Sequence, residues 1–125
     1  MKSQAITFFA LIIMATAMIS PVSFAGDVEI LDVKASSSGS TWSFSVTLKH
    51  ADEGWDHYAD HWAVYSPDGS LLGERVLAHP HVDEQPFTRS LSGVVIPDGV
   101  KEVVIKARDS VHGVSPKTYL VRIAE

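Results

Sequence analysis

Hydrophobic and polar residues alternate along much of the chain beyond residue 27. From Trp42 to Lys49, apolar side chains stand at every second position, and Ser, Thr or Lys occupies the positions between them. This period of two places one face of an extended segment in a core and the other in water, which is typical of a half-buried β-strand. A helical period is absent from this part of the sequence, apart from one helical turn that could form over 56–61. The pattern therefore predicts an all-β protein.

Turn-forming residues divide this part of the chain into seven predicted strands. The segments 66–69 and 97–99 have the composition of turns, because Pro presets φ and Gly supplies a left-handed conformation. Another polar turn is predicted over 36–40. Gly93 is predicted to form a β-bulge, because the alternation of the fifth strand breaks there. The predicted strands cover residues 28–35, 42–49, 61–65, 71–77, 87–96, 103–108 and 119–123.

Seven short strands within about 100 residues predict a seven-stranded antiparallel immunoglobulin-like sandwich. A small β-barrel is the alternative fold. The chain contains no cysteine, so this sandwich has to be held together by packing alone, without a disulfide. Trp62, on the third predicted strand, is expected in the core. Trp55, which lies beside Gly54 in a loop, is expected to be exposed.

The first 25 residues have the pattern of a secretory signal. Lys2 precedes an uncharged apolar run over 5–19, and small residues stand at Ser23 and Ala25. Because this run is shorter than the ~20 residues that a membrane-spanning helix needs, we expect cleavage after Ala25. The uncleaved membrane anchor is the alternative, and the lack of cysteine argues against a lipid anchor. The sequence thus predicts a signal peptide at 1–25, a domain at 26–125 and a periplasmic or secreted location.

The domain that follows the signal is acidic. Removing Lys2 leaves 9 basic against 15 acidic residues, a net charge of −6. An acidic surface repels phosphate backbones and anionic lipid headgroups, so neither nucleic acid nor a membrane surface is an expected partner. A protein or small ligand of the cell envelope is expected instead.

Histidines are concentrated in three of the predicted loops. If successive strands alternate in direction, the loops at 50–60, 78–86 and 109–116 lie at one end of the sandwich, and all six histidines lie in or beside them. Neutral imidazole is the commonest side-chain ligand for Zn²⁺ and Cu²⁺. Since the domain has neither Cys nor Met, a Cu⁺ site is disfavoured. The predicted metal ligands are His57, His61, His79, His81 and His112.

Spacing offers two pairs among these ligands. His57 and His61 would share one face of a helical turn, and His79 and His81 would share one face of an extended segment. Neither pair matches a specific signature such as H-E-x-x-H. A structural network of histidines, acids and aromatics is therefore the alternative interpretation of the loops, with Arg89 paired to an acid such as Glu84.

Two further functions can be weighed on the same loops. A non-metal interaction module would use Trp55, Tyr58 and Glu84 to bind a protein or small molecule. For catalysis, Ser110 stands two residues from His112, but it lacks the glycines of a nucleophile elbow. No catalytic residue is predicted, and the chain is not expected to be an enzyme.

Three motifs give the chain a resemblance to known proteins. They are GWDHYAD at 54–60, HPHVDEQPFTRSL at 79–91 and ARDSVHG at 107–113. With them the chain resembles a group of small exported bacterial proteins that have no assigned activity. The resemblance implies an envelope location and an immunoglobulin-like sandwich, and it implies no catalytic residue.

Overall fold

A computed structural model describes residues 26–124, and the predicted signal segment at 1–25 lies outside the described residues. Strands and connecting loops make up the described chain, which contains no helix. None of it could therefore cross a membrane as a helix. The strands are β1 (Glu29–Ser38), β2 (Thr41–Lys49), β3 (Ala59–Tyr65), β4 (Leu71–Val76), β5 (Phe87–Val94), β6 (Glu102–Asp109), β7 (Gly113–Val114) and β8 (Tyr119–Arg122).

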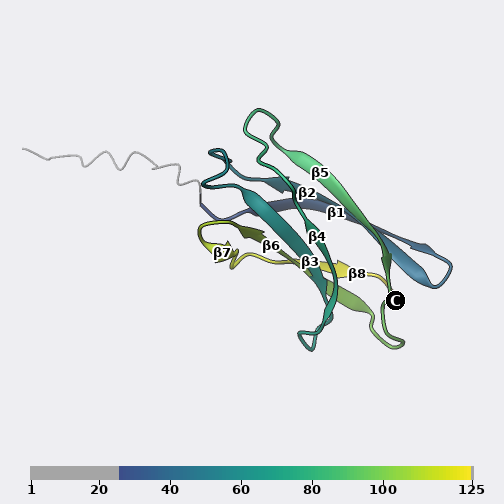
Figure 1. The fold of residues 1–125 in the computed structure, drawn as a ribbon. Coiled ribbons are helices and arrows are strands. Elements are labelled where there is room, and N and C mark those ends of the chain that lie inside the picture. Colours follow the sequence, from purple (N-terminus) through teal and green to yellow (C-terminus); the bar gives the residue numbers. More distant parts are fainter. Residues whose placement is uncertain (1–25, 125) are drawn as a thin grey trace, which may run out of the picture.

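These strands form two antiparallel sheets that pack face to face (Figure 1). One sheet has the order β1-β2-β5, and the other has the order β4-β3-β6 with β7 and β8 both paired to β6. The predicted immunoglobulin-like sandwich is confirmed. Within residues 26–124 the two sheets stay separate, so the alternative of a small closed barrel is wrong. In the constant-type immunoglobulin order the fourth strand pairs with the fifth, whereas here β4 pairs with β3.

The last predicted strand, 119–123, forms as β8, and an additional short strand, β7, lies in the predicted loop at 109–116. β7 pairs with the end of β6 through Asp109 and Gly113, and β8 pairs with the start of β6 through Ile105 and Tyr119. Between them the Ser115 N–H donates to the Ala107 carbonyl at 2.8 Å. β7 was not predicted, because two residues are too few to show an alternation.

The core lies between the sheets and contains the residues that the alternation assigned to it. Trp62 is completely buried on β3, as expected. Its neighbours in the core come from both sheets, because the inward faces of β2 and β6 carry apolar residues at every second position. The largest fully buried apolar side chains are Trp62, Phe44, Phe87, Leu48, Ile105, Val28, Val46, Val64 and Val103.

The three-stranded sheet has a register shift at Ile30–Asp32 on β1, and glycines stand at two other irregular positions. The register between β2 and β5 shifts from the pair Trp42–Val94 to the pair Phe44–Leu91, and Gly93 has φ 73° there. The predicted bulge is confirmed. The predicted turn at 36–40 is too long, because β1 continues to Ser38 and a two-residue loop follows. Gly39, at the first position of that loop, has the positive φ that a type II′ turn requires.

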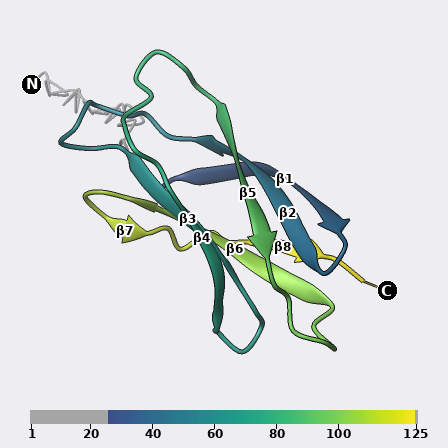
Figure 2. The ribbon, with the colours of Figure 1, turned by 45° about the vertical axis from the view of Figure 1, so that its right-hand side comes forward.

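The loops before β3, β5 and β7 lie at one end of the sandwich, and the hairpin turns β1–β2, β3–β4 and β5–β6 lie at the other (Figure 2). The predicted sorting of the loops is therefore correct. Because the histidine-bearing segments meet at one end, their side chains can form a common site.

Candidate metal centre

Asp52 connects the loops at the histidine end. Its side chain is fully buried. Oδ1 accepts the Ala59 N–H at 3.0 Å and lies 2.6 Å from His50 Nδ1, and Oδ2 accepts the His81 N–H at 2.7 Å. The carboxylate thereby joins the end of β2, the start of β3 and the β4–β5 loop.

The contact with Asp52 sets the proton position on His50. An ionised carboxylate can only accept a hydrogen bond, so we assign the imidazole proton to Nδ1 and a lone pair to Nε2. His50 is 3% exposed, and Nε2 is buried without a hydrogen-bond partner among the described residues. Buried polar atoms are almost always paired, so this nitrogen needs an explanation. A histidine that donates one N–H to a carboxylate and leaves the other nitrogen free has the usual arrangement of a metal ligand.

His57 and Asp109 lie beside this free nitrogen. The His57 ring contacts the His50 ring edge-on, with the ring centroids 4.8 Å apart. His57 Nε2 is 3.2 Å from Asp109 Oδ1, yet it has no hydrogen-bond partner within residues 26–124. One ligand atom from each of His50, His57 and Asp109 lies within 4.8 Å of the other two. Tetrahedral Zn²⁺ with bonds of about 2.0–2.1 Å has ligand atoms roughly 3.3 Å apart, so the His57–Asp109 distance already suits an ion.

Asp109 is held in place by the turn that follows β6. Its Oδ1 accepts the N–H groups of Val111 and His112 at 2.8 and 2.7 Å, and its Oδ2 lies 3.3 Å from His112 Nδ1. Burial by itself raises the pKa of the Asp109 carboxyl. The two N–H groups, together with the charges of His112 and His57 when protonated, outweigh burial and hold the pKa below its usual value. Asp109 is therefore a carboxylate at neutral pH.

Ser110 and Gln85 fix the loops around the cluster. The Ser110 hydroxyl accepts the Tyr58 N–H at 3.0 Å, and the Ser110 N–H donates to the Tyr58 carbonyl at 2.9 Å. The Gln85 side chain accepts the His50 N–H at 3.0 Å and donates to the His81 carbonyl at 2.8 Å. Ser110 therefore has a structural role, because it connects the loop after β6 to the loop before β3.

The structure brings together only part of the predicted ligand set. His57 and His112 lie side by side, with ring centroids 4.9 Å apart, and His50, which the prediction left out, lies next to them. Residues 54–57 form a turn and β3 begins at Ala59, so the expected helical turn is wrong. His61 consequently lies on β3, where Nε2 is 3.0 Å from Glu74 Oε2. The sequence signal that could have found His50 is its place two residues before an acid at a strand end.

His79 and His81 lie together in the β4–β5 loop, with ring centroids 4.6 Å apart. His81 stacks on Phe87 at 4.0 Å, and its Nε2 is 2.9 Å from an Arg89 nitrogen. Since a guanidinium can only donate, this Nε2 accepts, and the proton lies on the buried Nδ1. Burial, and then the charges of Arg89 and His79, lower the pKa of His81. His79 is exposed. Neither ring belongs to a group of three candidate ligands within residues 26–124.

The residues predicted for a non-metal ligand lie on the surface. Trp55 is 67% exposed, as expected, and its ring contacts half-buried Tyr58 edge-on at 5.7 Å. Glu84 is exposed, and its Oε1 lies 3.9 Å from Arg89, so the expected pair is a loose one.

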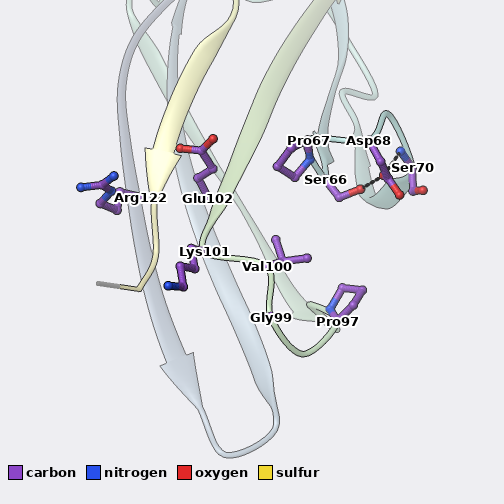
Figure 3. A pocket seen from close by; sticks show the side chains of 10 residues that line it. All are labelled: Ser66, Pro67, Asp68, Ser70, Pro97, Gly99, Val100, Lys101, Glu102 and Arg122. Carbon is purple, nitrogen blue, oxygen red and sulfur yellow. Dashed lines mark hydrogen bonds between the residues drawn. The ribbon is translucent and has the colours of Figure 1, made fainter.

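A pocket lies at the opposite end of the sandwich, between the β3–β4 and β5–β6 turns (Figure 3). It is open, measures about 560 Å³ and contains no histidine. In Figure 3 the Lys101 and Arg122 side chains point away from the space between Pro67 and Pro97. Asp68, in the same lining, accepts hydrogen bonds from the Ser66 hydroxyl and the Ser70 N–H within the β3–β4 turn.

Comparison with known proteins gives a distant context for this site. No family model matches the chain. A protein of Halomicrobium mukohataei named "Putative lipoprotein" is 40% identical over 96 residues, which are 76% of this chain and 47% of that protein. The chain thus spans about half the length of this curated relative.

A solved structure supports the fold alone. The crystal structure of a hypothetical protein from Pyrococcus horikoshii OT3 superposes with a TM-score of 0.53 at 11% sequence identity. The match covers 78% of this chain and 89% of that protein.

Proposed function

We propose that this domain is an exported module that binds a divalent metal ion, Zn²⁺ or Cu²⁺, through His50, His57 and Asp109. The observation that carries the proposal is the buried Nε2 of His50, which has no hydrogen-bond partner among the described residues and whose opposite nitrogen is held by Asp52 at 2.6 Å. A carboxylate in that position orients the imidazole and makes it a stronger ligand. Asp52 is then a positioning residue that does not touch the ion.

The donor set favours a site with an open position. Two imidazoles and one carboxylate are a frequent protein ligand set for Zn²⁺, in which water or another ligand takes the fourth place. Cu²⁺ binds nitrogen and oxygen donors more tightly than Zn²⁺ does. The same donors also suit Fe²⁺, which makes Fe²⁺ a useful third probe.

Local charge also favours a cation. Asp52, Asp109 and Glu53 surround the imidazoles, and their ion pairs within residues 26–124 are all with histidines. None of these partners carries a permanent positive charge, as an arginine would. A divalent ion would compensate the buried carboxylate.

Metal affinity of the protein purified without a histidine tag tests this function. In calorimetry at pH 7.5, we expect His50→Gln, His57→Gln and Asp109→Asn each to weaken Zn²⁺ binding by more than about 100-fold, beyond the 10–100-fold expected for the positioning variant Asp52→Asn. His61→Gln and His79→Gln are matched controls and should bind like the unmodified protein. A protein that binds neither Zn²⁺ nor Cu²⁺, or one that loses binding only in the two controls, contradicts this site.

The exported location is part of the same proposal. It is supported by the signal pattern at 1–25 and by the relative that carries the name of a lipoprotein. We expect the protein from its native host to have the mass of a chain that begins at Gly26. An intact mass that includes residues 1–25 would contradict cleavage after Ala25.

Exposed Trp55 supports a second candidate function, that of a protein-interaction module. A large aromatic side chain that is 67% exposed next to Tyr58 is typical of a binding hot spot. A photo-crosslinking amino acid placed at Trp55 should then capture a defined envelope protein, whereas one at Val95, which is 64% exposed, should not. Equal labelling from both positions would contradict a specific interface.

A further inference from the structure

Asp109 belongs to a second group of candidate ligands. One ligand atom from each of Asp27, Asp109 and His112 lies within 4.8 Å of the other two. Asp27 and His112 are exposed, whereas Asp109 is completely buried. Because Asp109 is common to both groups, the two candidate sites are immediate neighbours.

We propose that the domain binds a second divalent ion at Asp27, Asp109 and His112, and that the Asp109 carboxylate bridges the two ions. This inference rests on the proposed metal-binding function. The two oxygens of Asp109 face different histidines: Oδ1 lies 3.2 Å from His57 Nε2, and Oδ2 lies 3.3 Å from His112 Nδ1. Each oxygen can therefore serve one ion. In two-metal protein sites the ions are about 3.5–4 Å apart, a separation that one carboxylate can span.

The charge of Asp109 gives an independent reason for a cation on this side. Its side chain has no exposed surface, and its ion-pair partners within residues 26–124 are two histidines. A buried carboxylate without a permanent positive partner is costly. An ion between Asp27 and Asp109 would compensate the second oxygen as the first ion compensates Oδ1.

The two sites should differ in strength and in access. The first has two buried imidazoles and should bind tightly and exchange slowly. The second has two carboxylates and one imidazole, with Asp27 and His112 at the surface, and should bind more weakly and exchange with solvent. Its oxygen-rich donors suit Mn²⁺ as well as Zn²⁺.

Zinc stoichiometry of the untagged protein tests the bridged pair. We expect calorimetry and metal analysis to give two Zn²⁺ ions per chain, with two separable affinities. Asp27→Asn and His112→Gln, which alter exposed side chains, should each leave one tightly bound ion. His50→Gln should leave one weakly bound ion, and Asp109→Asn should weaken both.

Asp32→Asn is the matched control, because Asp32 is an exposed acid on β1, and it should keep both ions. Circular dichroism checks that every variant is folded. One Zn²⁺ per chain in the unmodified protein, or two ions that persist in Asp27→Asn, would overturn the bridged pair and leave the first site intact. Binding of no ion would overturn both proposals.

As a second readout, Cu²⁺ at two equivalents should give the electron paramagnetic resonance spectrum of a magnetically coupled pair. Asp27→Asn should restore the spectrum of an isolated ion. An uncoupled spectrum in the unmodified protein at full loading would contradict the bridge.

Discussion

Trp62 and Trp55 show how residues of one type take opposite roles within a short stretch of chain. Trp62 is completely buried in the core, and Trp55 is 67% exposed in the loop before β3. Large-to-small replacement of a core aromatic typically costs about 3–5 kcal/mol, so we expect this loss for Trp62→Ala. Trp55→Ala should stay within about 0.5 kcal/mol, as surface changes do. Urea unfolding measures both, and equal losses would contradict the two environments.

His81 is expected to make the metal-free protein sensitive to mild acid. Its folded-state pKa is lowered by burial, Arg89 and His79, whereas an unfolded histidine has a pKa of ~6.5. Between these two pKa values the unfolded chain binds more protons than the folded chain. The contribution of His81 to the free energy of unfolding is therefore fully present above pH ~6.5 and decreases as pH drops below that value. The loss should be smaller in His81→Gln. Denaturant unfolding with a chelator between pH 7.5 and 5 measures this difference, and parallel pH curves would contradict it.

Asp109 affects the stability of the protein in a different pH range. Its lowered pKa contributes stability above the unfolded value of ~3.9, and that stability is lost as pH falls through the folded-state pKa. The two groups can therefore be told apart by pH. His81 affects the range below ~6.5, and Asp109 affects only the range below ~3.9.

At the scale of elements, the sequence predicted the strands that have a regular alternation, and it missed features that depend on contacts between residues far apart in the chain. β2 was predictable because its alternation is unbroken over 42–49. The exposed serines at the end of β1 suggested a turn, yet pairing with β2 keeps them extended. The ring of His50 could not be assigned a role, because its orientation depends on Asp52, which in turn bonds His81 across 29 residues of sequence. Periodicity reports burial, but it does not report which loops meet.

The bulge on β5 can be tested at the same scale. Gly93 has φ 73°, and a Cβ added there would meet nothing within 4 Å. The cost of Gly93→Ala is therefore that of the backbone conformation alone, about 1–2 kcal/mol. Ser92→Ala, on the neighbouring exposed residue, should change stability by less than about 0.5 kcal/mol. A Gly93→Ala protein as stable as Ser92→Ala would mean that the bulge can relax.

For the whole molecule, the absence of cysteine means that three long loops are held only by packing, hydrogen bonds and any bound ion. Asp52, Ser110 and Gln85 fix these loops without metal. In the described part of the chain, Nε2 of His50 and Nε2 of His57 have no hydrogen-bond partner, so this end of the sandwich should gain most from an ion. Binding to the folded state alone then links metal affinity to global stability.

This linkage predicts how much Zn²⁺ should stabilise the folded protein. At a free Zn²⁺ concentration 100 times the dissociation constant, binding should add about 2.7 kcal/mol to the free energy of unfolding. For a domain of this length that corresponds to a rise in Tm of roughly 10–20 °C. The rise should be smaller at pH 5.5 than at pH 7.5, because protonated imidazole cannot bind the ion. Thermal unfolding monitored by circular dichroism at pH 7.5 and 5.5 measures it. Asp109→Asn should abolish the rise and His61→Gln should retain it, since His61 lies on β3 against Glu74; a rise that survives Asp109→Asn would place the ion elsewhere.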